Sequence, residues 1–176
     1  MIEFFNTVAG LKYIPRKGWK QKANIEKAES VADHSFSMTV MAMVFADLLG
    51  LDTKKVLTMS LLHDLAESIT GDFTPNEISK KEKIKLENKT MRRILSKLPP
   101  NIASSYENTW MEYQDEKSKE SVLVHEVDHL EMALQAKKYQ KDGHALDLLE
   151  DFFNTARNEI KSNELLKILD KITAEK

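Results

Sequence analysis

The sequence of 176 residues is long enough for one domain with a continuous core, since single domains commonly hold about 100 to 200 residues. Its 41% of hydrophobic and 31% of charged residues are typical of a water-soluble globular protein and exclude the disordered and collagen-like classes. With 26 basic and 28 acidic residues the net charge is only −2, which argues against nucleic-acid polymers and anionic membranes as partners. The sequence has no cysteine, so disulfides are excluded and any metal site must use nitrogen and oxygen ligands.

The N-terminal segment does not resemble an export signal. Residues Met1 to Leu11 include Glu3 and lack a basic flank followed by an apolar stretch. No apolar run approaches membrane-spanning length. We therefore expect a cytoplasmic protein without a membrane segment.

Proline and glycine divide the chain into segments that mostly show helical periodicity, and few stretches alternate as strands do. This pattern predicts one all-α domain over residues 1–176. An amphipathic segment containing Phe4 and Leu11 is followed by a loop, Pro15 to Trp19, that is expected to display charge beside an aromatic ring. We see no repeat, linker or low-complexity tract.

Two helices are predicted in the next part of the chain. The first runs from about Val31 to Gly50, which is placed as a C-terminal cap. Apolar residues follow helical spacing along it, at Phe36, Val40, Met43, Val44 and Leu48. The second begins at a cap formed by Asp52 or Thr53, holds His63 and Asp64 in its middle, and continues to Gly71.

The remaining segments are also expected to be helical. A lysine-rich helix that ends at Pro99 and a following segment with Trp110 and Tyr113 are expected to be peripheral. A further helix runs from Lys119 to about Tyr139, and two amphipathic helices complete the chain.

Ionisable residues interrupt the apolar pattern of the second helix. His63, Asp64 and Glu67 lie within Leu61-Leu62-His63-Asp64-Leu65-Ala66-Glu67. Burying such groups is costly unless they are paired or bind a metal. Because helical spacing puts Glu67 one turn beyond His63 and Asp64, all three can face one cavity.

Two more polar residues stand in apolar surroundings, His34 near a helix start and Asp128 between Val127 and His129. With His63 and Asp64 they supply two imidazoles and two carboxylates, a set suited to divalent metals with open coordination positions. The alternative is that each residue makes an ordinary hydrogen bond or lies on the surface, since an isolated His-Asp pair often does so.

These residues, in the order His34, His63-Asp64, Asp128, make the chain resemble the HD-domain superfamily of metal-dependent phosphohydrolases. More narrowly, the chain is similar to the 5′-deoxynucleotidase branch over about residues 11–153. The matching motifs are Arg16-Lys17-Gly18-Trp19, Glu29-Ser30-Val31-Ala32-Asp33-His34-Ser35, His63-Asp64-Leu65-Ala66-Glu67 and Gly71-Asp72. The resemblance implies a helical bundle with the metal site between core helices.

The resemblance also implies roles for particular residues. His34, His63, Asp64 and Asp128 are expected to hold one divalent metal, which activates water for attack on phosphorus. Manganese or cobalt is favoured, and zinc, nickel, iron or magnesium would also fit.

The resemblance further implies that Glu67 and Asp72 orient water and transfer protons. Arg16 is expected to bind phosphate, and Trp19 to pack against the sugar or base. For Arg16 the alternative is a solvated loop residue, and for Trp19 it is an anchor in the core.

One position departs from the family pattern. His125 stands where relatives often have a lysine three residues before the final metal-binding aspartate. If His125 contacts phosphate, activity should depend more strongly on pH than with lysine there. His129 and His144 have no assigned role and are expected on the solvated surface.

The function implied is hydrolysis of deoxyribonucleoside 5′-monophosphates to deoxyribonucleoside and phosphate. One alternative is another HD phosphohydrolase, a phosphodiesterase or a nucleoside triphosphohydrolase. The other is a helical interaction module without catalysis. The family resemblance also implies a homodimer.

Overall fold

The computed structural model describes residues 1–74 and 76–175, and within these ranges the chain is helical without a β-strand. The helices are α1 (Ile2–Gly10), η1 (Leu11–Tyr13), α2 (Lys17–Ala23), α3 (Val31–Leu49), α4 (Thr53–Leu62), α5 (Glu67–Thr70), α6 (Lys80–Leu95), α7 (Pro100–Asp115), α8 (Lys119–Lys141), α9 (Leu146–Glu159) and α10 (Asn163–Ala174). The all-α prediction is therefore confirmed. None of the described helices is long and apolar enough to cross a membrane.

Helix α3 begins and ends where its sequence signals predict. At its start, the Ser30 hydroxyl accepts the Asp33 N–H, and the Asp33 carboxylate accepts the Ser30 N–H, which together form a capping box. At its end, Gly50 adopts a left-handed conformation with φ +65°, which a residue with a side chain would adopt at a cost. Helix α4 likewise begins at Asp52, whose carboxylate accepts the Lys55 N–H. These caps fix His34 in the first turn of α3.

The prediction of one helix from Thr53 to Gly71 is wrong, because α4 ends at Leu62 and turns replace the helix over residues 63–66. In this segment the N–H of Leu65 donates to Leu62 and that of Glu67 donates to Asp64, each three residues back. Such bonds tighten the chain relative to an α-helix. His63 and Asp64 therefore lie in a tight turn between α4 and α5.

The loop predicted at residues 15–19 is only partly present, because Lys17 already belongs to α2. Gly18 is tolerated in the first turn of this short helix. The Trp19 side chain is 1% exposed and stacks on Phe152, with ring centroids 4.1 Å apart. The predicted display of this ring on the surface is wrong, since a large aromatic ring gains most by burial.

The segments expected to be peripheral instead form part of the core. Trp110 of α7 is 1% exposed and donates its Nε1–H to Asn88 of α6 at 2.6 Å. Met91 and Ile94 of α6 are fully buried. The lysine-rich composition of α6 therefore describes only its outer side.

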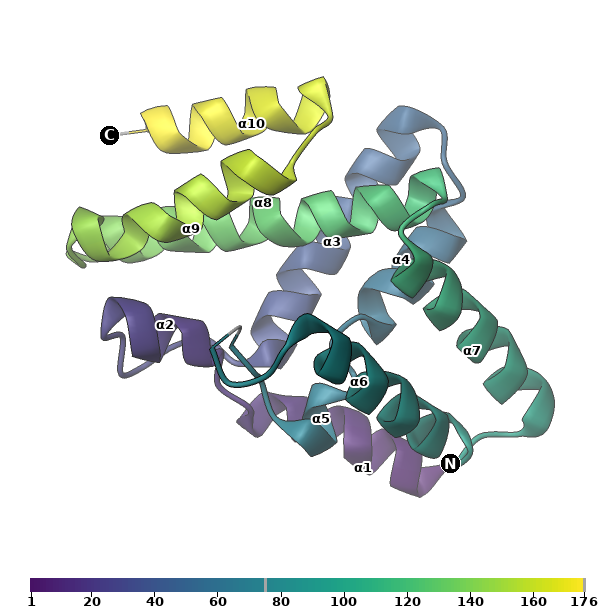
Figure 1. Ribbon diagram of the computed structural model, residues 1–176. Helices are drawn as coiled ribbons and strands as arrows, with labels where there is room; N and C mark the ends of the chain where they lie inside the picture. The colour runs from purple at the N-terminus through teal and green to yellow at the C-terminus, as the bar shows by residue number, and fades with distance from the viewer. Residues whose placement is uncertain (75, 176) are drawn as a thin grey trace.

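Helix α8 lies at the centre of the fold and packs against α3, α4, α7, α9 and α10. Figure 1 shows α8, α9 and α10 stacked together, while α1, α5 and α6 gather at the other end of the molecule. The main hydrophobic core joins α3, α4 and α8, and a second cluster, with Trp19, Tyr139, Leu149 and Phe152, fastens α2 to α8 and α9. The metal-ligand candidates therefore sit on elements held from several sides.

Glu126 fastens the C-terminal helix to α8. This buried carboxylate accepts the N–H groups of Lys161 and Ser162 at 2.8 and 3.0 Å and the Ser162 hydroxyl at 2.5 Å. Ser162 is the residue that precedes α10. Glu126 is thus the main polar contact at the start of that helix.

We predict that Glu126→Ala lowers the free energy of unfolding by about 2 to 3 kcal/mol, because it strands three donors that a carboxylate now satisfies. The measurement is urea unfolding followed by circular dichroism. The matched control is Glu150→Ala on α9, where the side chain is exposed and the change should stay within about 0.5 kcal/mol. Equal stability of the two variants would contradict this role.

Candidate metal centre

Two imidazole rings face each other at the centre of the molecule. The Nε2 atoms of His34 on α3 and His63 after α4 are 3.3 Å apart. On the far side of each ring, the Nδ1 atom has a fixed partner: the Glu131 carboxylate lies 2.6 Å from that of His34, and the Ser60 carbonyl lies 2.7 Å from that of His63. These acceptors favour a proton on Nδ1, which leaves Nε2 of each ring as a potential metal ligand.

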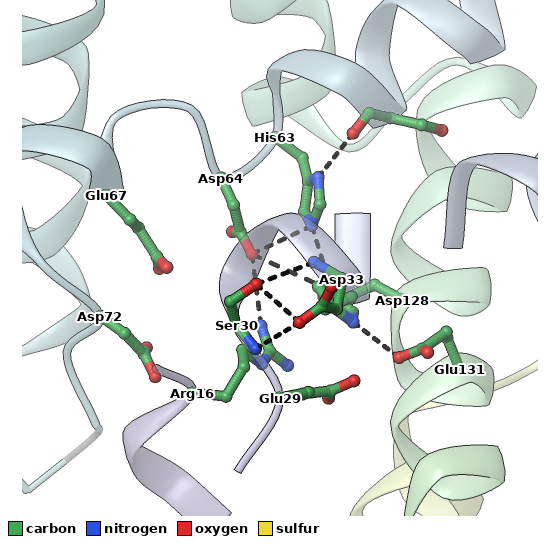
Figure 2. A network of polar contacts seen from close by, with 12 residues as sticks. Arg16, Glu29, Ser30, Asp33, His63, Asp64, Glu67, Asp72, Asp128 and Glu131 are labelled. Carbon is green, nitrogen blue, oxygen red and sulfur yellow. Dashed lines mark hydrogen bonds and ion pairs between the residues drawn. The ribbon is translucent and has the colours of Figure 1, made fainter. Parts of the chain in front are cut away.

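Two carboxylates close the group from other helices. Asp128 of α8 places Oδ1 3.1 Å from Nε2 of His34, and Asp64 places Oδ2 3.2 Å from Nε2 of His63. Figure 2 shows His63, Asp64 and Asp128 converging on one point, with Glu131 on the opposite side from Glu67 and Asp72. All four residues predicted as metal ligands are therefore brought together, although they come from three separate parts of the chain.

This donor set fits a divalent metal. Atoms of His34, His63 and Asp128 that can bind a metal all lie within 4.8 Å of one another, and Asp64 adjoins them. Two imidazole nitrogens with lone pairs directed at the same point repel each other unless a proton or a cation lies between them. Two neutral imidazoles and two carboxylates are ligands suited to manganese, cobalt, iron, nickel or zinc.

The charges around the group show that it needs compensating positive charge. Burial and the Arg16 cation lower the pKa of His34, but hydrogen bonds to Asp128 and Glu131 outweigh them and raise it to about 10. Burial alone would raise the pKa of Asp64, yet the neighbouring His63 and the Arg16 guanidinium hold it well below its ordinary value. Without a metal, the protein thus balances its carboxylates with a proton and an arginine.

Arg16 is aimed at the group by backbone pairing. An isolated bridge joins Pro15 to Ser30, and the Arg16 N–H donates to the Glu29 carbonyl at 3.0 Å. This places the Arg16 Nη1 3.2 Å from Oδ2 of Asp64. Burial lowers the pKa of Arg16, but the surrounding carboxylates, Asp64 first, raise it overall. Arg16 is therefore a fixed cation at the edge of the site.

Glu67 and Asp72 lie on one side of the group, as Figure 2 shows. Glu67 is 2% exposed, and its Oε2 has no hydrogen-bond partner among the described residues. Burial raises its pKa well above the ordinary value, and the charges of Asp64 and Asp72 raise it further. Asp72 is oriented by the Lys17 N–H, which donates to its Oδ2 at 2.6 Å. The two acids thus have different surroundings.

The sequence analysis missed Lys83, which reaches the site from α6. Its Nζ lies 3.6 Å from Glu67 and 3.5 Å from Glu87. Burial lowers the pKa of Lys83, but Glu67 and Glu87 raise it by more. Helix α6 carries many lysines, so only its packing against α5 and α7 shows which of them points inward.

Glu131 was also missed, although its signal was present in the sequence. It is 2% exposed and lies one helical turn after Asp128, on the same side of α8. An acid at that spacing from a predicted ligand on a buried helix face would have identified it. Burial, followed by the charge of Glu131, raises the pKa of neighbouring Glu29.

Two clefts open onto the candidate metal ligands. The first, about 310 Å³ in volume, is lined by Arg16, Glu67, Asp72, Phe73 and Phe152 among others. The second, about 690 Å³, lies next to it. Both are lined by Asp64, Lys83, Asp128, His129 and Thr155. The ligand group therefore stands where the two clefts meet.

The other histidines occupy more defined places than expected. His125 stacks on Tyr113 with centroids 4.1 Å apart and lines the second cleft. The expectation that His129 and His144 are solvated surface residues is wrong. His129 is half-buried where the clefts meet, and His144 is half-buried against Tyr139. Trp19 lines the first cleft, but its burial limits the surface it offers there.

Comparisons with known proteins agree with this site. Residues 8–169 match the family model described as an HD domain. The human 5′-deoxynucleotidase HDDC2 is 34% identical over 177 residues, which cover all of this chain and 86% of that protein. The Dictyostelium discoideum 5′-deoxynucleotidase HDDC2 is 38% identical over 167 residues, or 89% of this chain and 87% of that one.

A solved structure shows the same fold. The PH0347 protein from Pyrococcus horikoshii OT3 superposes with a TM-score of 0.80 at 31% identity, and the match covers 98% of each chain. A helical bundle with a His, His-Asp, Asp group between its core helices defines the class. The chain belongs to the HD domain family.

We predict that Glu131→Gln weakens manganese binding by about 10- to 100-fold, because the neutral amide holds the His34 ring less firmly and makes its Nε2 a poorer ligand. Titration of metal-stripped protein against a fluorescent chelator measures the affinity. The control is Glu120→Gln, at the start of the same helix, which should bind manganese like the unaltered protein. Unchanged affinity in Glu131→Gln would rule out the role.

Glu67 should make the protein less stable as pH rises. Because its folded-state pKa is raised, the unfolded chain releases this proton first, and stability falls with pH above the ordinary carboxyl value. We expect metal-stripped Glu67→Gln to gain stability over the unaltered protein between pH 5 and pH 8, by about 1.4 kcal/mol per unit of pKa shift within that window. Denaturant unfolding at both pH values tests this, and a stability difference that does not change with pH would contradict it.

Proposed function

We propose that this chain is a metal-dependent 5′-deoxynucleotidase, which hydrolyses deoxyribonucleoside 5′-monophosphates to deoxyribonucleoside and inorganic phosphate. The observation that carries the proposal is the group of His34, His63, Asp64 and Asp128 at the junction of two clefts. Relatives that are named 5′-deoxynucleotidases align over the whole chain or nearly so, which supports the choice among HD-domain reactions.

The four ligands would hold one divalent ion, with manganese or cobalt favoured and zinc, nickel, iron or magnesium also compatible with the donor set. When bound, such an ion polarises phosphate oxygen and lowers the pKa of water. The protein's part is to hold the ligands in place. It does so through Glu131 and the Ser60 carbonyl, which fix the two rings.

Cations beside the ligands provide the binding site for phosphate. Arg16 presents a guanidinium that pairs with Asp64 in the absence of substrate, and Lys83 stands across the same cleft wall. A guanidinium can form two parallel hydrogen bonds to phosphate. We propose that Arg16 moves part of its bonding from Asp64 to the substrate, and that Lys83 adds a second positive charge.

Glu67 and Asp72 divide the proton transfers. Glu67 is buried with a raised pKa and an unpartnered oxygen, so it can hold a proton at neutral pH for the departing nucleoside oxygen. Asp72 is fixed by the Lys17 N–H and is the candidate for orienting the attacking water.

The walls of the clefts supply places for the nucleoside. Phe73, Met132 and Phe152 give the first cleft an apolar side, which suits a base or a deoxyribose. Trp19 backs this wall through its stack on Phe152. His125 borders the second cleft beside Tyr113, and we keep it as a candidate substrate contact.

Two alternatives give different products. A phosphodiesterase or nucleoside triphosphohydrolase of the same family would release a nucleotide, pyrophosphate or triphosphate. A non-catalytic interaction module would need no metal, and the cost of burying this ligand group argues against it. We further propose a cytoplasmic homodimer that does not bind nucleic-acid polymers, in line with the near-neutral charge of the chain.

We predict that metal-stripped protein releases phosphate from deoxyribonucleoside 5′-monophosphates only after manganese or cobalt is added, and releases less from the ribonucleotides. Phosphate detection over a panel of both substrate classes measures this. Equal rates on both classes would remove the deoxy preference. No release with any metal would contradict the nucleotidase proposal.

Asp64→Asn is the matched test of the site, because an amide of the same shape replaces one ligand oxygen. We expect at least a 100-fold loss of phosphate release, with the helical circular dichroism signal retained. Full activity in this variant would show that the reaction occurs elsewhere.

A further inference from the structure

Helix α3 carries a row of large apolar side chains that no described residue covers. We call this row the α3 outer face. Its members and their exposed fractions are Phe36 74%, Val40 43%, Met43 38%, Val44 48%, Leu48 73% and Leu49 43%. An apolar stripe at this helical spacing normally packs against other side chains. Here the stripe faces outward.

The other side of α3 is already packed. Val31, Met38, Ala42 and Ala46 are fully buried there, and His34 extends from the same side to the metal-ligand group. The outer face therefore cannot turn inward without removing His34 from the site. Between Asp33 and Asp47 the helix has no charged residue, so about three turns of exposed helix have no charge to keep them in water.

Neighbouring elements extend this apolar surface. Helix α3 packs against α4 and η1, and η1 packs against α1. Leu61 of α4 is 59% exposed, and Phe5 and Val8 of α1 are 59% and 40% exposed. The exposed apolar residues of the chain are thus concentrated on its N-terminal half.

We propose that the α3 outer face is the surface through which two copies of this chain associate, with α3 packed on the same helix of the second copy. Taking about 150 to 250 Å² for a fully exposed large side chain, the six residues present roughly 600 Å² of apolar surface. This equals the largest patches on monomers, about 300 to 600 Å². It also supplies most of the roughly 800 Å² per partner in a standard interface.

The composition of the face selects a second copy over other occupants. Interfaces with transient partners are about as polar as the rest of a protein surface, whereas those of permanent homodimers are more apolar. Helix α3 has no lysine or arginine, and its two charged residues, Asp33 and Asp47, are acidic, which disfavours an anionic membrane. A two-fold axis lets a single apolar stripe serve as both halves of the contact.

This inference names the surface of the homodimer proposed above and concerns the helix that also holds His34. Association would clamp α3 from the side opposite the metal-ligand group. Its test does not use phosphate release, so its failure can be told apart from failure of the nucleotidase proposal.

Because the chain has no cysteine, single cysteines report contacts between copies without background. We expect at least one of Val40→Cys, Val44→Cys and Leu48→Cys to form a disulfide-linked dimer within minutes of mild oxidation, since side chains near a two-fold axis lie within disulfide reach of their own copies. The control is Leu146→Cys, which is 53% exposed on α9, and it should cross-link at least 10-fold more slowly. Equal cross-linking of all four variants would overturn the proposal.

Sedimentation velocity provides an independent test. The unaltered protein should sediment with twice the mass of one chain, and Phe36→Asp should raise the dimer dissociation constant by roughly 100-fold or more. Because Phe36 is 74% exposed, the variant should keep its fold, as circular dichroism will show. A dimer that persists unchanged in Phe36→Asp, or an unaltered protein that is monomeric at all concentrations, would overturn the proposal.

Discussion

Two imidazole nitrogens 3.3 Å apart, bordered by two carboxylates, form an arrangement that is unfavourable without added positive charge. Much of the surrounding structure supplies or directs such charge. Arg16 is held by a backbone bridge beside Asp64, and Glu131 keeps the His34 ring turned inward. A divalent ion satisfies the same requirement more completely, because it binds all four groups at once.

This requirement also explains irregular features of the fold. The chain leaves helical geometry at residues 63–66, where the tight turn presents His63 and Asp64 to the same point as His34. Glu67 follows directly and is buried without a full set of partners. Such a group lowers stability, and strained or unsatisfied groups in a folded protein tend to mark functional sites. The surrounding core of α3, α4 and α8 supplies the stability that this local arrangement lacks.

The sequence was sufficient to predict features that depend on local chemistry. Ser30, Gly50 and Asp52 marked helix ends, and the four ligand candidates stood out as ionisable groups in apolar surroundings. Features set by packing were not predictable. Nothing local distinguishes Lys83 from the other lysines of α6, and the hydrogen bonds that break the helix at His63 leave no compositional sign. The outward direction of Phe36 and Leu48 also depends on which side of α3 the site occupies.

The most direct test of the central claim is a crystal structure of the protein soaked with manganese, with anomalous diffraction recorded to locate the ion. We expect one strong peak per chain, within roughly 2 to 2.3 Å of Nε2 of His34, Nε2 of His63 and one oxygen each of Asp64 and Asp128. A peak that contacts none of these atoms, or the absence of any peak at saturating manganese, would contradict the assignment of this group as the metal centre.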